Sequence, residues 1–336
     1  MKNARLFATL AALAVLSAPA GAADPVQLKF ALPAPATSPV LKWGVEPWSK
    51  DVERDAQGTV EIKVFPGPTL GNFTNIYERT LAGVADASFG IFGPLATQFT
   101  QVNVAALPFE SKNTIESSIA LWRLYDKRLI ASEFDKVKVL ALFTFPHSGF
   151  HANKPVRKAD DIKGLKIVTS NRAMSQLVSF LGGSPVTSTP PDYYTTVSRG
   201  IADGIAVGWS AVASFKLDEV TRHHLDTESG LFTAFMLMNK DSYAKLPAPA
   251  RAAIDRHSGE PFFKTMGNAT DRMEREGRAA TAAKAGHTIV ALDPAEAERW
   301  KRLSQPIVDE WLGRTRDGAR ILAAFREEIG KIRAGM

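Results

Sequence analysis

The stretch DDIKGLKIVTSNR, residues 160–172, predicts the fold class because it joins two kinds of secondary structure without a break. Its middle part, LKIVTS (165–170), is a short apolar run of the kind found in buried strands. Asn171 follows at once and is a preferred N-cap residue for a helix, which we expect over 171–181. A strand that leads directly into a helix is typical of an α/β protein.

The same alternation continues along the chain on both sides of this stretch. Further strands are expected at 26–33, 60–67, 83–93, 138–145, 204–209 and 232–239. Helices are expected at 39–57, 73–81, 115–125 and 191–199. Strands that alternate with helices indicate βα units and mostly parallel sheets. Because the pattern restarts after the helix at 115–125, we expect two α/β domains.

The last third of the chain is expected to be mainly helical. A helix beginning near Pro261 can run to Ala285, with Asp271–Arg275 and Glu274–Arg278 pairs at i,i+4 spacing. At 1.5 Å per residue this helix is about 35 Å long, enough to cross both domains. A short strand at 287–292 and a helix capped by Asp293 follow.

The first residues indicate export. Lys2 and Arg5 precede an apolar run at 6–16, and small residues end at Ala22, which together predict a secretory signal (1–22) cleaved near Ala22. The run is shorter than the roughly 20 residues that a membrane-spanning helix needs. We therefore expect a soluble mature protein in the periplasm.

Composition excludes several functions. The chain has no cysteine, so disulfides, thiolate catalysis and cysteine-ligated metals are excluded. Its formal charge is +6, and removal of the signal leaves 39 basic against 35 acidic residues. The basic residues are interspersed with acidic ones, as in 271–278, which indicates a solvated helix face rather than a nucleic-acid surface.

No catalytic motif stands out. The sequence lacks G-x-S-x-G, G-x-G-x-x-G, a Walker loop and H-E-x-x-H. His147 and His151 follow a strand, and in extended chain they lie about 13 Å apart, too far to share one zinc ion. We expect His223 and His224 in a surface turn. An exported protein with two α/β units, and without a catalytic set, cofactor site or metal site, is typical of a receptor that closes on a solute.

Seven stretches, in order, resemble one family. They are KFALPAPATSP (29–39), VEIKVFPGPTLG (60–71) with GVADASFG (83–90), LPFES (107–111), DDIKGLKIVTS (160–170), LGGSPV (181–186), RGIADGI (199–205) and MNKDSYAKLP (238–247). In this order and spacing the chain resembles the DctP-type solute receptors of TRAP transporters. The resemblance covers essentially the whole mature chain.

The resemblance implies a two-domain periplasmic receptor with a long helix shared by both domains and a cleft that closes by hinge motion. Receptors of this family deliver solutes, mostly small organic acids, to membrane permease subunits driven by a sodium gradient. By analogy, domain I comprises 24–145 plus 233–272. Domain II comprises 146–232 plus 273–336.

The resemblance also implies an altered binding site. In most of the family the position of Val168 carries an arginine that grips the substrate carboxylate as a bidentate fork. Relative to the sialic-acid receptors, Ile91 stands at an acidic position, Pro94 at a basic one, Ser148 replaces a second arginine and Val207 replaces an asparagine. The lining is therefore shifted from ionic to apolar. Either the ligand is less anionic, or its charge is met elsewhere.

Several nearby groups are candidates for contacting the ligand. The free amides of a helix that starts at Asn171 suit an anion, and Arg172 and His147 are the nearest alternative cations. Arg172 is equally well explained as an exposed helix residue. The complete set of expected ligand-binding residues is Asn72, Phe73, Phe92, His147, Ser148, Val168, Asn171, Arg172, Val207 and Trp209, of which Phe73, Phe92 and Trp209 are expected to form flat apolar walls.

The function expected from these patterns is a TRAP receptor for a small organic acid, partly apolar or aromatic. One alternative keeps the fold but presents the closed form to a membrane signalling partner. A second is an exported enzyme on the same scaffold, since fold alone does not fix function.

Overall fold

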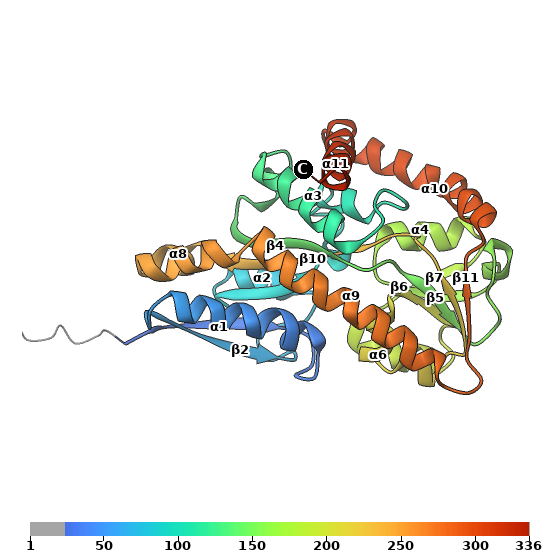
Figure 1. The fold of residues 1–336 in the computed structure, drawn as a ribbon, viewed down its shortest axis with the longest axis horizontal. Helices are drawn as coiled ribbons and strands as arrows, with labels where there is room; N and C mark the ends of the chain where they lie inside the picture. Colours follow the sequence, from blue (N-terminus) through green and yellow to red (C-terminus); the bar gives the residue numbers. More distant parts are fainter. Residues whose placement is uncertain (1–23, 336) are drawn as a thin grey trace, which may run out of the picture.

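The computed structural model describes residues 24–335 and contains two β-sheets surrounded by helices. The secretory signal expected over 1–22, with its cleavage near Ala22, lies outside the described residues. Figure 1 shows the two sheets side by side, each with its own helices. We name the halves lobe I and lobe II. Within 24–335, no helix combines the length and apolarity needed to cross a bilayer.

The sheet of lobe I has the strand order β2-β1-β3-β10-β4. Its strand β10 runs antiparallel to both neighbours, and the other strands are parallel to one another. The bounds are β1 Val26–Leu32, β2 Val60–Pro66, β3 Ala87–Ile91, β4 Val137–Phe145 and β10 Phe232–Asn239. The strands predicted for this lobe are confirmed.

The sheet of lobe II has the order β11-β9-β5-β8-β6-β7, and here β5 is the antiparallel strand. The bounds are β5 Gly149–Ala152, β6 Lys166–Thr169, β7 Ser184–Thr187, β8 Gly204–Val207, β9 His223–Asp226 and β11 Thr288–Ala291. Two α/β units with mostly parallel sheets were predicted correctly. The surface turn expected at His223 and His224 was wrong, because both residues pair with neighbouring strands in β9.

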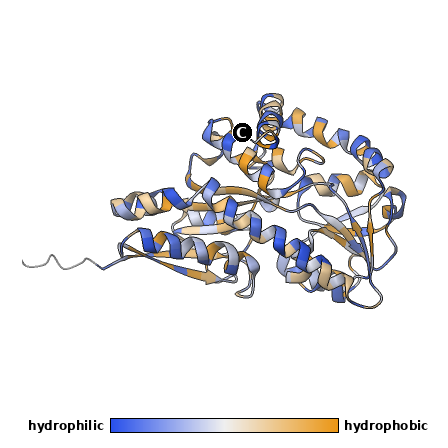
Figure 2. Ribbon diagram, in the orientation of Figure 1, coloured by the Kyte–Doolittle hydropathy of each residue, from blue (hydrophilic) through white to orange (hydrophobic). Residues whose placement is uncertain are grey.

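Helices cover both faces of each sheet. In lobe I, α1, α8 and the first half of α9 cover one face, and α2, α3 and α11 cover the other. In lobe II, α4 and α10 cover one face, and α5 and α6 the other. The bounds of the helices are α1 Glu46–Asp55, α2 Ile76–Leu81, α3 Thr114–Asp126, α4 Arg172–Phe180, α5 Tyr193–Ser198, α6 Trp209–Ser214, α7 Lys240–Lys245, α8 Ala248–His257, α9 Glu260–Ala282, α10 Pro294–Arg314 and α11 Gly318–Arg333. In Figure 2 the helices carry both hydrophilic and hydrophobic residues.

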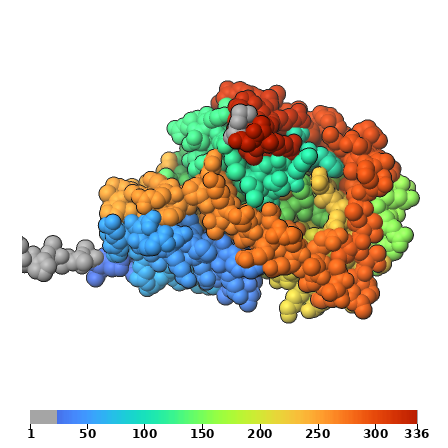
Figure 3. Space-filling model, viewed as in Figure 1, coloured from blue at the N-terminus to red at the C-terminus, as the bar shows by residue number. Residues whose placement is uncertain are grey.

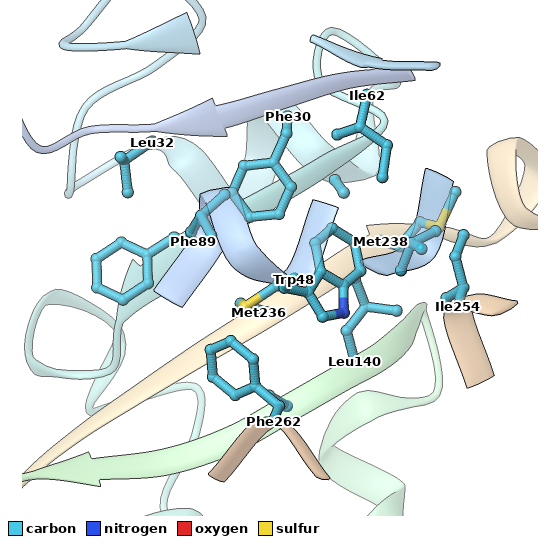
Figure 4. Packing of buried hydrophobic residues seen from close by; sticks show 14 of the residues in the cluster. Phe30, Leu32, Trp48, Ile62, Phe89, Leu140, Met236, Met238, Ile254 and Phe262 are labelled. Carbon is cyan, nitrogen blue, oxygen red and sulfur yellow. The ribbon is translucent and has the colours of Figure 1, made fainter. Parts of the chain in front are cut away.

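Burial on both faces explains the unbroken apolar sequence of β10. Met236 packs into the cluster under α1 and α8, whereas its neighbour Phe235 packs into the cluster on the opposite face. Figure 4 shows Met236 beside Trp48, Phe89 and Phe262 in the first of these clusters. A strand between two helical layers has no solvent side and therefore shows no alternation.

Two segments carry the chain between the lobes near the cavity. One joins β4 to β5 through Ser148, and the other joins β9 to β10 through 227–231. The backbone N–H of Ser148 donates to the carbonyl of Gly230 (3.0 Å). The Ser148 carbonyl accepts from the hydroxyls of Thr227 (2.7 Å) and Ser229 (3.1 Å). These bonds hold the two crossing segments together.

The long shared helix is α9, Glu260–Ala282, which was predicted at 261–285. It lies across both lobes (Figures 1 and 3). Met266 packs in lobe I, whereas Gly277 lies against the backbone of Trp209 in α6, where an added Cβ would come within 2.5 Å of the Trp209 carbonyl. The helix therefore contacts both halves of the molecule.

The C-terminal helices return across the top of the molecule in Figure 1. Helix α10, Pro294–Arg314, packs on α4, and α11, Gly318–Arg333, packs on α3. Ile321, Phe325 and Ile329 of α11 belong to the core of lobe I. The division that we expected assigns 273–336, and with it α11, to domain II. In the structure α11 packs in lobe I instead, because its apolar stripe matches the outer face of α3.

Candidate ligand-binding cavity

A cavity lies between the lobes, beside the crossing segment at Ser148. The volume of the cavity is about 110 Å³, counting only positions open to the centre of a water molecule. Lobe I lines it with Ala34, Ser38, Pro39, Val40, Phe73, Phe89, Ile91, Phe145 and Phe232. Lobe II lines it with Ser170, Pro190, Tyr193, Ala206, Val207, Gly208, Ser210, Ala211, Ser214 and Phe215. Pro146 and Ser148 of the crossing segment and Met273 of α9 complete the lining.

Aromatic rings form much of the wall. Phe89 meets Phe73 (6.3 Å, 82°) and Phe145 (6.2 Å, 88°) edge to face, and Phe145 lies 6.3 Å from Phe232. On the side of lobe II, Tyr193 and Phe215 are 5.6 Å apart at 78°. Edge-to-face rings hold one another in place and present flat apolar surface to a ligand. This wall suits an aromatic ring.

The lining is uncharged. Among the described residues that form it, there is no aspartate, glutamate, lysine, arginine or histidine side chain. Its polar side chains are the hydroxyls of Ser38, Ser148, Ser170, Tyr193, Ser210 and Ser214. An anion that enters such a cavity loses hydration without gaining a cation.

Val168 lies beneath this lining rather than in it. It is fully buried in the cluster with Tyr193, Val197 and Val212, whereas its neighbour Ile167 is buried on the opposite face of the sheet. The ring of Tyr193 belongs both to this cluster and to the cavity wall. Val168, where the resemblance implies an arginine in most of the family, is therefore buried in one cluster with Tyr193 and is not part of the lining.

Three of the expected site residues line the cavity, namely Phe73, Ser148 and Val207. Phe92 lies in the core of lobe I, 4.9 Å from the ring of Phe235. Asn72 accepts hydrogen bonds from the backbone and hydroxyl of Thr74 just before α2.

The residues expected to meet a charge lie outside the apolar cavity. Asn171 caps α4 by accepting from the backbone N–H of Met174 (2.8 Å). Arg172 is paired with Glu310 (2.8 Å). His147 faces a second, more polar hollow that Asp271 also lines, and burial lowers its pKa below the ordinary value. These three side chains do not line the apolar cavity.

Trp209 lines the second, more polar hollow rather than the apolar cavity. Its indole N–H donates to Asp226 (2.6 Å), and its ring lies 4.7 Å from that of His151. Its backbone N–H and that of Ser210 each donate to the carboxylate of Glu274 at 2.7 Å. Burial raises the pKa of the Glu274 carboxyl, and the hydrogen bonds to Ser210 and Trp209 oppose that rise.

Three consecutive residues of α9 reach three different places. Arg272 lies over the ring of Trp43 in lobe I, 4.4 Å from its centroid. Met273 lines the cavity, and Glu274 holds the start of α6 in lobe II. The shared helix thus contacts both lobes where it passes the cavity.

The lobes touch directly at Gly93, which follows β3. A Cβ added there would lie 1.9 Å from the carbonyl oxygen of Ser170 in lobe II. Such an approach to backbone leaves room for no residue other than glycine. The contact lies beside the cavity, since Ser170 is part of the lining.

A chain of histidines, missed in the sequence, lies behind the cavity. His151 Nε2 is 3.0 Å from the carbonyl of Val207, which only accepts, so this nitrogen donates. Its Nδ1 then accepts from His224 Nδ1 (2.9 Å), and His224 Nε2 accepts from His287 Nδ1 (2.9 Å). Arg222 donates to the remaining nitrogen of His287 (2.7 Å). Every imidazole in this arrangement is neutral.

Burial is the largest cause of the lowered pKa values of His151, His224 and His287. It lowers the pKa of His151 to about 4. The pKa of His224 falls to about 3, through burial first and then through the repulsion that a proton on a neighbouring histidine would exert. Among the described residues, no group of three or more side chains is arranged to hold a metal ion.

Other cavity residues were also missed by sequence reasoning, above all Tyr193, Phe89, Phe145, Phe215 and Phe232. Several occupy or follow strand ends near the crossing segments. In α/β proteins ligands bind at the carboxyl ends of strands, and this rule points to Ser170, which directly follows β6.

The chain has relatives along its whole length. The model of the DctP family, bacterial extracellular solute-binding protein family 7, matches residues 30–314. A protein of Comamonas testosteroni named outer membrane transporter protein TsaT is 30% identical over 318 residues, covering 93% of each chain.

Two solved structures share the fold. One is a marine metagenome TRAP solute-binding protein specific for aromatic acid ligands, in complex with 3-hydroxybenzoate, with a TM-score of 0.87, 27% identity and coverage of 92% of this chain and 99% of that one. The other, from Rhodoferax ferrireducens, carries copurified benzoate, with a TM-score of 0.86, 30% identity and coverage of 91% and 98%. Since the family model matches most of the chain and these structures share its fold, the chain belongs to the DctP family of bacterial extracellular solute-binding proteins.

Proposed function

We propose that this protein is the extracytoplasmic receptor of a TRAP transporter and binds a small aromatic organic acid in the cavity between its lobes. The observation that carries the proposal is the cavity wall, which is built from phenylalanine rings of lobe I and Phe215 and Tyr193 of lobe II. A planar ring that enters this space exchanges water for edge and face contacts with these side chains.

The relatives support the ligand class. The Rhodoferax ferrireducens protein holds benzoate and the marine protein holds 3-hydroxybenzoate, each at TM-scores above 0.85 to this chain. Highly charged dicarboxylates fit the lining poorly because its described side chains supply no cation. The relatives give no support to a sensing receptor or to an exported enzyme.

The proposal includes export through the signal at 1–22 and delivery of the ligand to the permease subunits of a TRAP transporter. The closed form that presents the ligand is held at the contact of Gly93 with Ser170. Lobe motion about the crossing segments at Ser148 and 227–231 opens the cavity.

Thermal unfolding of the mature protein with candidate ligands tests the function. Benzoate and 3-hydroxybenzoate are expected to raise the melting temperature, because a ligand at a hundred times its Kd stabilises the folded state by about 2.7 kcal/mol. Phe89→Ala is expected to abolish the shift, whereas Phe180→Ala, at an exposed ring on α4, serves as the matched control. Stabilisation by succinate or sialic acid alone contradicts the proposal.

A further inference from the structure

The hydroxyl groups of the cavity differ in whether they are already engaged. The Ser214 hydroxyl donates to the carbonyl of Ser210 (2.6 Å), and the Ser210 hydroxyl bonds the Glu274 carboxylate. Ser38 Oγ accepts from the backbone N–H of Val40 (3.2 Å). The hydroxyls of Ser214 and Ser210 are therefore used within the protein, that of Ser210 toward the shared helix α9, and the hydroxyl oxygen of Ser38 is tied to its own segment.

Ser148 differs from these three residues because its backbone, and not its hydroxyl, makes the bonds that hold its segment in place. Its backbone N–H and carbonyl fix it between the crossing segments, through the bonds to Gly230, Thr227 and Ser229. The residue is 5% exposed and lines the cavity. Its hydroxyl takes no part in the bonds that hold the crossing segments together, so it can donate to or accept from a bound molecule.

Tyr193 places a second hydroxyl in the wall. Its ring is 3% exposed and is held by the edge of Phe215 and by Val168 beneath it. The Ser170 hydroxyl lies near this phenol. If the two hydroxyls bond each other, they use only one of their two hydrogens, so the pair keeps one donor for a ligand. Burial raises the pKa of the Tyr193 phenol, which keeps it protonated.

The charged groups around the cavity are engaged elsewhere. Arg278 is paired with Asp226 at 2.9 Å, and Arg172 with Glu310 at 2.8 Å. The amides at the start of α6 already donate to Glu274. The carboxylate of a ligand placed at the start of α6 would therefore meet the carboxylate of Glu274 and would find no free N–H donor there.

We propose that Ser148 and Tyr193 bind the polar head of the ligand through neutral O–H donors, so that the receptor accepts uncharged aromatic amides together with aromatic carboxylates. A guanidinium fork selects a carboxylate by charge and by bidentate geometry. A hydroxyl donates to any oxygen lone pair, and desolvation favours the neutral head group. This inference rests on the proposed aromatic cavity and names the residues that determine specificity in it.

Calorimetric titration of the mature protein with benzoate and with benzamide, which have the same shape, tests the inference. The two affinities are expected to agree within about tenfold. Tyr193→Phe and Ser148→Ala are each expected to weaken both ligands by about tenfold, the effect of losing one hydrogen bond worth about 1.4 kcal/mol. Tyr194→Phe is the matched control, because the Tyr194 hydroxyl bonds Glu219 on the surface.

The outcomes separate the inference from the function. Benzoate binding that exceeds benzamide binding by more than a hundredfold, with both variants unchanged, overturns the inference and leaves the aromatic receptor standing. If neither compound nor any other aromatic acid binds, the proposed function fails and the inference fails with it. Thermal unfolding of each variant without ligand distinguishes lost binding from lost folding. If Tyr193→Phe is unstable, Ser148→Ala, which removes only the hydroxyl oxygen, still decides the test.

Discussion

The buried histidine chain predicts a specific loss of stability in mild acid. His151 is fully buried, and both of its ring nitrogens are already engaged, one as donor to Val207 and one as acceptor from His224. Protonation of His151 would bring two N–H groups face to face at 2.9 Å. The folded protein therefore resists protonation of this ring.

The size and sign follow from the pKa values. The pKa of His151 is about 4 in the folded protein, against an ordinary value of 6.5. Between these values the unfolded chain binds a proton that the folded chain does not, so the free energy of unfolding falls as the pH falls from 6.5 toward 4. At 1.36 kcal/mol per pKa unit, His151 alone accounts for a loss of about 2 kcal/mol by pH 5 and about 3 kcal/mol by pH 4. The lowered pKa of His224 adds to this loss of stability in acid.

The assay is urea unfolding, followed by tryptophan fluorescence, at intervals from pH 7.5 to pH 5. His151→Asn lowers stability at neutral pH, but its stability is expected to depend less on pH than that of the wild type, by about 2 kcal/mol over this range. His223→Asn is the matched control, because His223 is the neighbouring residue in β9 and lies outside the hydrogen-bonded chain. Carboxylates with raised pKa values, such as Glu133 and Glu274, titrate alike in all three proteins. Parallel pH profiles for wild type and His151→Asn would refute the reasoning.

Three further predictions concern the cavity and its supports. Gly93→Ala is expected to weaken ligand binding at least about tenfold without unfolding either lobe, since the Cβ of the new alanine overlaps the Ser170 carbonyl and disfavours the closed form. An unchanged affinity, measured by calorimetry, would contradict this prediction. Val168→Arg is expected to destabilise the protein by about 3 kcal/mol or more, because the cation is buried beneath Tyr193 without a partner; stronger carboxylate binding at unchanged melting temperature would show that residue 168 reaches the cavity. Glu274→Gln is expected to cost about 1–2 kcal/mol in unfolding experiments, since the amide has one acceptor oxygen for two backbone donors, whereas Glu276→Gln on the same helix is expected to change nothing.

The apolar strands, long or short, could be predicted from sequence, but the short strands that contain histidine could not. Strands β4 and β10 are runs of eight or nine residues, VKVLALFTF and FTAFMLMN, whose composition indicates burial. Strands β5 (GFHA) and β9 (HHLD) have four residues each and contain histidine. Their extended form depends on pairing with each other, through His151 and His224, and the local sequence contains no sign of that contact.

The same limit applies to the cavity. Ile167 and Val168 are both apolar, and both faces of their sheet are covered by helices, so the pattern does not show which of them faces the ligand. The family resemblance led to Phe73, Ser148 and Val207, which line the cavity. Tyr193 was missed because its role depends on where α5 packs over β6.

The position of β10 in the middle of its sheet has a consequence for how the protein matures. A nascent chain that has emerged only as far as residue 231 contains every strand of lobe II except β11, yet lobe I still lacks the strand that separates β3 from β4. Most strands of the second sheet can therefore pair before the first sheet is finished. When β10 inserts, it completes the sheet of the earlier lobe, and the helices that follow it in the chain then cover both sheets.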